Sequence, residues 1–507
     1  MNTADILERS LSDLQLDLAA NRVTAEKLVS QYLERIENLD RSGPCLRSVI
    51  ELNPDASSIA RALDEEFAVI GPRGPLHGIP VLIKDNIDTR DRMATTAGSL
   101  ALLGGVPPED AFVVQRLRAA GAVILGKTNM SEWANGRSRQ SSSGWSARGG
   151  LTRNPYALDR SASGSSSGSA VAVAASLCAA AVGTETDGSI LSPASVCGVV
   201  GLKPTVGLIS RRGIIPISHS LDTPGPMART VRDCALLLGA MTGADAQDAA
   251  MSGCRSHTLH DYAIALDNKA LRGARLGVVR QLFGFHDRVE QAYAPAMAAL
   301  KRAGAVLIDP IALPDLERLQ VAKTTVLLYE MKAGLNAYLQ RLGPDAPVKS
   351  LADVIAFNRR NAALEMPWFS QDIFFMSQAK GPLSDSDYLD ALAICRRIAG
   401  TDGIEKALQE YCLDALIAPT GGPAWCSDLI LGDHAAEGSS SPAAAAGVPS
   451  ISVPAGNVSG LPLGLSFFSG VWSEMSLLNL AYSFEQATCA RQPPLYLQNI
   501  DSRQEEY

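Results

Sequence analysis

Residues 163–190 read SGSSSGSAVAVAASLCAAAVGTETDGSI, in which two polar segments flank a run of small apolar residues. The apolar run is mostly alanine and valine, and it predicts a buried helix over residues 169–182. Serine and glycine in the flanking segments are typical of turns and helix caps. Because both polar segments adjoin the same buried element, we expect them to face one site.

Outside this stretch, short apolar runs alternate with helical patterns. The apolar runs predict strands of a largely buried sheet at residues 79–83, 123–125, 199–202, 276–279, 306–308, 415–418 and 451–453. Helical patterns lie between them, for example at residues 110–120, 288–302 and 405–412. This alternation predicts an α/β protein whose sheet carries helices on its faces.

Two stretches depart from the alternation. Residues 136–169 are rich in Ser, Gly and Arg, and residues 310–400 are dominated by helical patterns, including a long one over 316–342. The sequence contains no internal repeat and no linker sharp enough to divide it. We therefore predict one domain over residues 1–507, in which 310–400 is a helical insertion that covers the sheet.

The charge balance argues against nucleic-acid binding. The chain has 507 residues, with 45 Lys and Arg against 53 Asp and Glu, so its formal net charge is −8. Nucleic-acid-binding proteins more often carry a basic excess, because phosphate neutralisation dominates their affinity. A chain of this length buries a sizeable core without disulfides or metals.

Cysteine usage and hydropathy favour the cytoplasm. The nine cysteines are scattered, and none forms a C-x-x-C pair or a Cys/His cluster, which indicates reduced thiols and no zinc site. The N-terminal residues lack the apolar core of a signal peptide, and the apolar residues 170–182 are too few to span a bilayer. The expected protein is soluble and cytoplasmic, with no membrane partner.

Two familiar patterns occur in unsuitable surroundings. Residues 121–128, GAVILGKT, match the phosphate loop G-x-x-x-x-G-K-[ST], but AVIL predicts a buried strand rather than a phosphate-binding loop. Residues 164–168, GSSSG, match the nucleophile elbow G-x-S-x-G, which requires a preceding strand and a histidine base. Residues 153–160 instead predict a loop, and none of the six histidines has a suggestive setting. A nucleotide-binding protein remains an outside alternative.

A third pattern combines three segments: Lys84 after an apolar run, the Ser/Gly stretch 161–169, and residues 184–190. Each alone is ordinary, but together they resemble the amidase signature family over about residues 10–490. SGSSSGS at 163–169 stands where that family has GGSSGGS. Further segments with the family's wording are 76–86 (LHGIPVLIKDN), 126–132 (GKTNMSE), 193–195, 198–205, 222–228, 414–420 and 460–464.

The resemblance implies one large, twisted, mixed sheet with helices on both faces, and a core at 70–235 that carries the catalytic residues. It implies a Ser–Ser–Lys triad of Ser189, Ser165 and Lys84, with Ser166 as the fallback for Ser165. A lysine serves as the base only when burial lowers its pKa enough to keep it neutral. In the implied reaction Ser165 relays a proton between Lys84 and Ser189. Ser189 attacks the amide carbonyl, ammonia or an amine leaves, and water hydrolyses the acyl-enzyme.

The resemblance also assigns backbone and binding roles. It implies a cis peptide bond between Gly164 and Ser165. It implies an oxyanion hole formed by backbone N–H groups of Thr186, Asp187, Gly188 and Ser189. Asp187 replaces the glycine that is commoner in the family, and its carboxylate is a candidate contact for the substrate amide nitrogen. Further candidate substrate contacts are Met130, Ser131 and Trp133.

The wording DGS at 187–189 resembles the peptide amidase branch, which deamidates C-terminally amidated peptides. Residues 143–150 and 327–332 resemble it too, and aromatic residues of the insertion are expected to form an apolar lid: Trp368, Phe369, Phe374 and Phe375. Two alternatives stay open within the family: an amidase of small aryl amides such as benzamide, and the glutaminase subunit of a tRNA amidotransferase. We expect no metal, no cofactor, a peptide or small-molecule amide as the ligand, and a monomer or homodimer.

Overall fold

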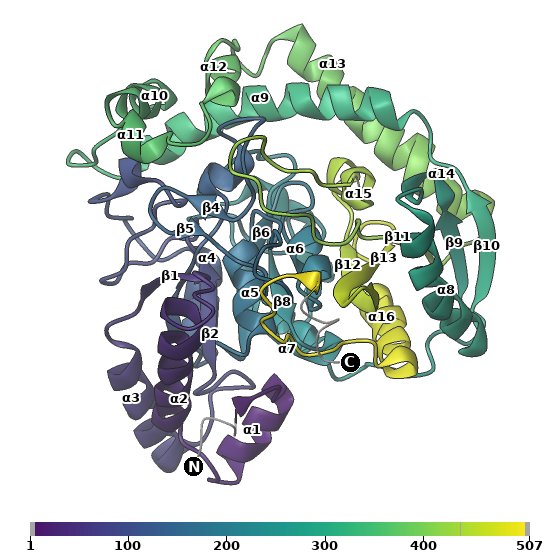
Figure 1. Ribbon diagram of the computed structural model, residues 1–507, viewed down its shortest axis with the longest axis horizontal. Coiled ribbons are helices and arrows are strands. Elements are labelled where there is room, and N and C mark those ends of the chain that lie inside the picture. Colours follow the sequence, from purple (N-terminus) through teal and green to yellow (C-terminus); the bar gives the residue numbers. More distant parts are fainter. Residues whose placement is uncertain (1–5, 437, 502–507) are drawn as a thin grey trace.

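A large mixed sheet runs through the computed structural model, which describes residues 6–436 and 438–501 (Figure 1). It has 11 strands in the order β1-β3-β2-β6-β8-β7-β12-β13-β11-β9-β10. β2 pairs in parallel with β3 and β6, and β9 with β10 and β11, while the other neighbours are antiparallel. The mixed sheet implied by the resemblance is therefore confirmed.

The strand positions agree with the apolar runs of the sequence. The strands are β1 (Val49–Leu52), β2 (Pro80–Lys84), β3 (Val123–Thr128), β6 (Ala180–Glu185), β7 (Val200–Lys203), β8 (Thr223–Ala228), β9 (Arg275–Val279), β10 (Val306–Ile311), β11 (Ala415–Pro419), β12 (Ser450–Val458) and β13 (Leu461–Phe468). A separate two-stranded sheet joins β4 (Trp145–Ser146) to β5 (Gly150–Leu151). All seven predicted strands are confirmed.

The predicted helix over 169–182 is wrong in its second half. Helix α5 is Ser167–Ala174, and the apolar run then turns at Ser176, whose φ is +54°, and continues as strand β6. Both elements are buried at every residue. Small apolar residues carry no periodicity that separates a buried helix from a buried strand, which explains the error.

Helices flank the sheet, as expected. They are α1 (Leu11–Ala19), α2 (Ala25–Ile36), α3 (Ala56–Ile70), α4 (Phe112–Ala119), α5, α6 (Leu191–Val196), α7 (Val231–Met241), α8 (Asp287–Arg302), α14 (Glu405–Glu410), α15 (Ser440–Ala446) and α16 (Glu474–Thr488). α5 contacts β2, β3, β6 and β8 near the middle of the sheet. Across the described ranges, none of the helices combines the length and the apolarity needed to cross a membrane.

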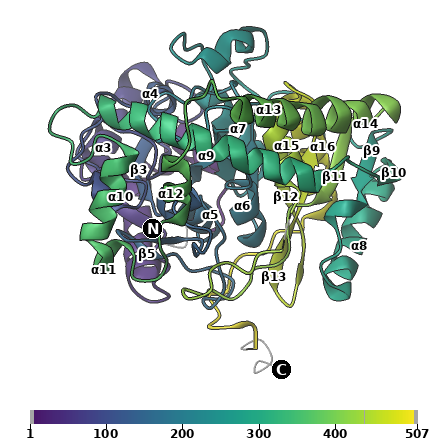
Figure 2. The same ribbon diagram turned by 90° about the horizontal axis from the view of Figure 1, so that it is seen from above.

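The predicted helical segment forms a roof over one side of the sheet. It contains α9 (Leu316–Arg341), α10 (Leu351–Arg360), α11 (Ala362–Glu365), α12 (Asp372–Gln378) and α13 (Ser386–Cys395). Figure 2 shows α9 running across the molecule, with α13 beside it. We call the segment 316–395 the helical roof.

Three buried side chains of α9 make polar contacts with parts of the described chain outside the roof. Lys323 contacts Asp187, Glu330 contacts the loop before β8, and Tyr338 donates a 2.8 Å hydrogen bond to Asp88. Their spacings of seven and eight residues place them about two helical turns apart on one side of α9. All three are almost fully buried, so the roof is held by buried polar contacts as well as by apolar packing.

Candidate functional site

Lys84 is the last residue of β2 and is fully buried. Its Nζ lies 2.7 Å from Ser165 Oγ and 3.0 Å from Ser166 Oγ. It also donates to the carbonyl oxygen (3.1 Å) and to the hydroxyl (3.0 Å) of Thr184 on β6. Parallel pairing of β2 with β6 brings these residues to the same edge of the sheet. Every oxygen atom that Lys84 contacts is neutral.

Burial lowers the pKa of Lys84 from 10.5 to about 7. The negative charges of Glu185 and Asp222 act in the opposite direction but are too weak to restore the usual value. Within the described ranges no carboxylate oxygen lies within 4.0 Å of its Nζ. A substantial fraction of Lys84 is therefore neutral near pH 7, as a general base must be.

The two neighbouring serines contact Lys84 in different ways. Ser166 Oγ also donates to the Thr184 carbonyl at 3.0 Å and accepts from the Thr184 N–H at 3.2 Å, so it is fully engaged with β6. In the described part of the chain, Lys84 is the hydrogen-bond partner of Ser165 Oγ. The Gly164–Ser165 peptide bond is cis. Ser165 thus keeps hydrogen-bonding capacity for a second partner, whereas Ser166 does not.

Ser189 ends the turn that follows β6, and 9% of its surface is exposed. Its carbonyl accepts a 3.0 Å hydrogen bond from the Ser166 N–H, which joins this turn to the serine loop. Among the described residues, the N–H groups of Thr186, Asp187 and Ser189 donate to no protein acceptor. The Gly188 N–H instead faces the buried carboxylate of Glu185, as do those of Ile190 and Leu191.

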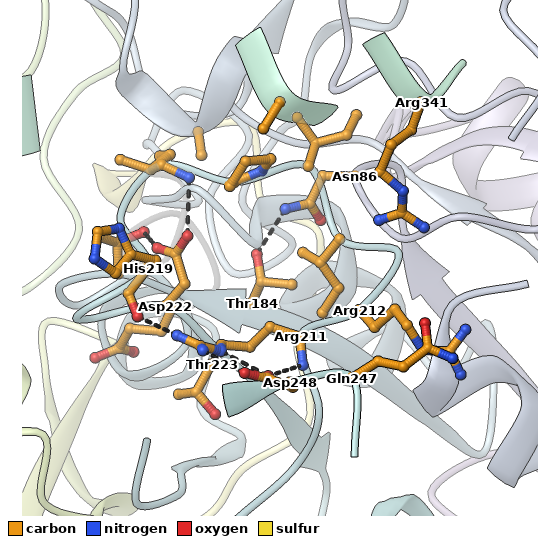
Figure 3. Close-up of a pocket in the computed structure, with 18 residues that line it drawn as sticks. Asn86, Thr184, Arg211, Arg212, His219, Asp222, Thr223, Gln247, Asp248 and Arg341 are labelled. Carbon is orange, nitrogen blue, oxygen red and sulfur yellow. Dashed lines mark hydrogen bonds and ion pairs between the residues drawn. The ribbon is translucent and has the colours of Figure 1, made fainter. Parts of the chain in front are cut away.

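A cavity of about 510 Å³ opens beside this turn (Figure 3). Its wall includes Thr184, which contacts Lys84, and Asn86, whose Nδ2 donates to Thr184 Oγ1 at 3.0 Å. The loop 211–219 forms another side, where Arg211 is paired with Asp248. Arg341 of α9 projects into the cavity from the roof. The cavity is large enough for several residues of a peptide.

Asp222 connects the cavity wall to the turn. Its carboxylate accepts from Thr186 Oγ1 at 2.6 Å and from the N–H groups of Ile217 and Ser218 at 2.8 Å. Burial raises the pKa of Asp222 to about 6, and these hydrogen bonds only partly oppose the rise. The loop 217–222 and the turn 186–189 are therefore held in one arrangement by a single carboxylate.

The candidate substrate contacts Met130, Ser131 and Trp133 are buried, and none of them lines the larger cavity. Met130 and Trp133 line a second cavity of only about 10 Å³, which adjoins the larger one through Asn86, Ala134 and residues 215–217. Ser131 faces the serine loop, since its N–H donates to the Ser165 carbonyl at 3.2 Å. Their contact with a substrate stays a prediction.

The four aromatic residues expected to form a lid separate into two groups. Phe374 is buried, meets Trp133 edge-on at 5.7 Å between ring centroids, and lines the small cavity. Phe369 packs on Trp145 and away from either cavity lining. Trp368 and Phe375 are 44% and 40% exposed. Of the four, Phe374 alone lines one of the two cavities described above.

The carboxylate of Asp187 is already occupied by protein donors. Lys323 Nζ, Ser440 Oγ (2.7 Å) and Ser441 Oγ (2.7 Å) all donate to it. Burial raises the pKa of Asp187, but these three donors outweigh burial and lower it below the usual value. Asp187 is therefore ionised and held in place, and its role as a substrate contact stays a prediction.

The structure also tests the phosphate-loop pattern at 121–128 and the nucleophile-elbow pattern at 164–168. Residues 123–128 are strand β3 and are fully buried, so the phosphate-loop pattern is not a loop. The residues before Gly164 form no strand of the described sheets, as the loop prediction implied. Within the described ranges no group of three or more His, Cys, Asp or Glu could hold a metal ion.

Several residues of the site were not predicted. Asn86, Thr184 and Asp222 lie inside the segments that carry the resemblance, and their place in those segments is the sequence signal for them. Lys323 and Ser440 had no local signal, because they lie 136 and 253 positions from Asp187. Only the tertiary structure brings them to the turn.

Comparisons with known proteins extend over nearly the whole chain. The family model described as Amidase matches residues 27–478. A probable amidase of Arabidopsis thaliana is 42% identical over 505 residues, which cover 98% of this chain and 93% of that protein. A glutamyl-tRNA(Gln) amidotransferase subunit of Ralstonia nicotianae is 38% identical over 500 residues, covering 94% of this chain and 97% of that protein. The X-ray structure of native peptide amidase from Stenotrophomonas maltophilia has a TM-score of 0.91 and 50% identity, covering 97% of this chain and 99% of that one.

Proposed function

Because this chain belongs to the amidase signature family and is a hydrolase of amide bonds, we propose that it cleaves C-terminal peptide amides through Ser189, Ser165 and Lys84. One observation carries the proposal. A fully buried lysine with a pKa of about 7 lies 2.7 Å from a serine hydroxyl and contacts no carboxylate in the described ranges. Such a lysine can accept a proton from a serine near neutral pH.

In the proposed reaction neutral Lys84 accepts the proton of Ser165 as Ser165 accepts that of Ser189. The Ser189 oxygen attacks the amide carbonyl, and the C–O bond forms. The returning proton goes to the amide nitrogen, the C–N bond breaks, and ammonia leaves. Water then attacks the acyl-enzyme by the same proton path and releases the carboxylate.

The turn 186–189 is the proposed oxyanion hole. The unbonded N–H groups of Thr186, Asp187 and Ser189 are its available donors, while the Gly188 N–H faces Glu185. Removing one donor from an oxyanion hole typically lowers kcat by about 10²–10³-fold. Preorganised backbone donors of this kind stabilise the charge that develops during attack.

The peptide substrate is supported by the size of the cavity and by the peptide amidase of Stenotrophomonas maltophilia, which is similar over almost the full chain. The loop 211–219 and the roof enclose enough space for residues that precede the amide. A small aryl amide would leave much of this cavity empty.

Ammonia release from four amides tests the proposal: a C-terminally amidated dipeptide, benzamide, a fatty amide and glutamine. We expect the dipeptide amide to be the best substrate and Ser189→Ala to lower its turnover at least about 10⁴-fold. Ser166→Ala is the matched control for Ser165→Ala, and the larger loss should follow Ser165→Ala. Preference for benzamide or glutamine would overturn the substrate class, and full activity of Ser189→Ala would overturn the nucleophile.

A further inference from the structure

The turn 186–189 is held from outside the sheet by two elements that are distant in sequence. Asp187 accepts hydrogen bonds from Lys323 of α9 and from Ser440 and Ser441 at the start of α15. Lys323 Nζ also donates to Ser441 Oγ at 2.6 Å, so two of the donors are bonded to each other. The three donors and Asp187 form a closed polar cluster, which we call the turn clamp.

Gly188 provides independent evidence that Ser440 lies close to the turn. Its φ is +77°, which favours glycine, and a Cβ built on it would lie 2.9 Å from Ser440 Oγ and 3.4 Å from Ser440 Cβ. Ser440 therefore packs directly against the backbone of the turn. The turn is restrained both through the Asp187 side chain and through its own main chain.

The ion pair between Lys323 and Asp187 is largely buried, so its geometry affects the stability of the folded state. The side chains of Lys323 and Asp187 are 3% and 17% exposed, so neither charge is well solvated. Each needs the other, because an unpaired buried charge is costly. The position of Asp187 is thereby coupled to the position of α9, although α9 contributes no residue to the proposed triad.

We propose that Lys323 is a positioning residue, and that the turn clamp lets the helical roof set the geometry of the oxyanion hole. This inference rests on the proposed function, because it assumes that the turn binds the oxyanion. Asp187 supplies one of the unbonded N–H groups, so a change in its side-chain anchor moves a donor of the hole. The roof then influences the rate of attack and not only the binding of substrate.

Three variants separate positioning from stability. Lys323→Met should lower kcat about 10- to 100-fold, the effect expected from a misplacement near 1 Å, and change KM less than about threefold. Lys323→Arg keeps the charge and should recover most of kcat. Tyr338→Phe is the matched control, since it removes another buried polar contact of α9 yet should keep kcat within about twofold.

Lys323→Met leaves Asp187 without its ion-pair partner and can therefore impair folding. The double variant Asp187→Asn/Lys323→Met removes both charges, and its kcat should fall no further than that of the single variant, because the residues act through each other. Folding of every variant is checked by circular dichroism and thermal unfolding. A folded single or double variant with the wild-type kcat overturns the inference, as does an equal loss in Tyr338→Phe.

A second readout needs no amide substrate. A fluorophosphonate probe reacts with an activated serine through a transition state whose oxygen occupies the same hole. Its second-order rate with the wild type should fall about 10- to 100-fold in Lys323→Met. A wild type that reacts with the probe but cleaves none of the four amides would refute the substrate proposal alone. Equal probe rates in wild type and Lys323→Met would refute the turn clamp alone.

Discussion

The cluster around Lys84, which we call the floor, and the helical roof each contain a buried lysine, and the two lysines have opposite surroundings. The floor consists of Lys84, Ser165, Ser166 and Thr184, of which Thr184 lines the cavity, and every oxygen that contacts Lys84 is neutral. In the roof, Lys323 contacts the carboxylate of Asp187. Burial alone therefore does not make a lysine a base: the charge of its partners decides whether it becomes neutral or stays paired.

The same difference predicts opposite effects on stability. At pH 7 a buried lysine without a carboxylate disfavours the folded state, because the unfolded chain solvates the charge. Removing a buried lysine that is paired with a carboxylate leaves the carboxylate charge buried and unpaired, which destabilises the folded state. The measurements below test or sharpen this contrast, in order of decreasing effect.

Lys84→Met should have the largest effect on catalysis, with a fall in kcat/KM of at least about 10³-fold, because the base is lost. Its thermal stability at pH 7 should equal or exceed that of the wild type. Lys323→Met should instead lose about 3–5 kcal/mol in the free energy of unfolding. Steady-state kinetics and denaturant unfolding measure both. Equal destabilisation by the two variants would contradict the contrast between floor and roof.

The pH dependence of kcat/KM should report the titration of Lys84 directly. Activity requires the neutral amine, so kcat/KM should rise about tenfold per pH unit below an apparent pKa of about 7 and level off above it. Asp222, whose pKa is raised to about 6, is the competing titrating group. Asp222→Asn should leave the rising limb in place, and a limb that disappears in this variant would assign it to Asp222.

The pKa of Lys84 also determines the sign of the pH dependence of the free energy of unfolding. The pKa of Lys84 is about 7 when folded and 10.5 when unfolded, so between these values the unfolded chain binds more protons. The contribution of Lys84 to the free energy of unfolding therefore rises with pH across this window. The stability advantage of Lys84→Met over the wild type should shrink from pH 7 to pH 10. A difference independent of pH would place the pKa of Lys84 outside this range.

Glu330→Gln should have a moderate effect, which acts through the loop that Glu330 holds at the cavity. Glu330 is fully buried and accepts from Ser220 N–H (3.0 Å), Ser220 Oγ (2.6 Å), Ser218 Oγ and Tyr388 OH (2.6 Å). We expect a loss of about 1–3 kcal/mol in unfolding free energy and a KM raised a few-fold, because the loop at the cavity loosens. Tyr388→Phe removes one of these donors and should lose less. A kcat lowered as far as in Lys323→Met would contradict the special role of the turn.

Removal of metal ions should have the smallest effect. The proposed proton path uses lysine and serine side chains only, so activity should be unchanged after incubation with EDTA. Ammonia release before and after dialysis against the chelator measures this. Complete loss that zinc or magnesium restores would contradict the proposed mechanism.

The strands and the floor could be predicted because their signals are local. Apolar runs identified β2, β3 and β7, and the serine and glycine segments lie close to Lys84 as the resemblance implied. β8 was not predicted, since Pro224, Gly225 and Pro226 argue against a strand. Both prolines nevertheless lie in the ladder between β8 and β6, whereas β7 pairs with β8 only at Met227 and Ala228, beyond them.

The helices of the roof could be predicted from the sequence, but their contacts with the site could not. The pattern at 316–342 gives α9 almost to the residue, because helical periodicity is visible over such a length. Which buried residue of α9 meets which part of the site depends on packing between segments more than 100 positions apart. No property of Lys323 in the sequence distinguishes it from a solvated residue, and the resemblance over residues 327–332 assigns no role to Glu330.

The spacing of Lys323, Glu330 and Tyr338 limits how the length of α9 can vary. Each added residue turns the rest of a helix by about 100°, so one insertion between Lys323 and Tyr338 would carry at least one of the three contacts to the wrong side. Length can vary more freely in the connection at 379–385, where no residue is buried, than in the one at 342–350, where Leu342, Ala346 and Val348 are buried. New substrate ranges for this scaffold are best sought through insertions and deletions at 379–385, with α9 kept at constant length.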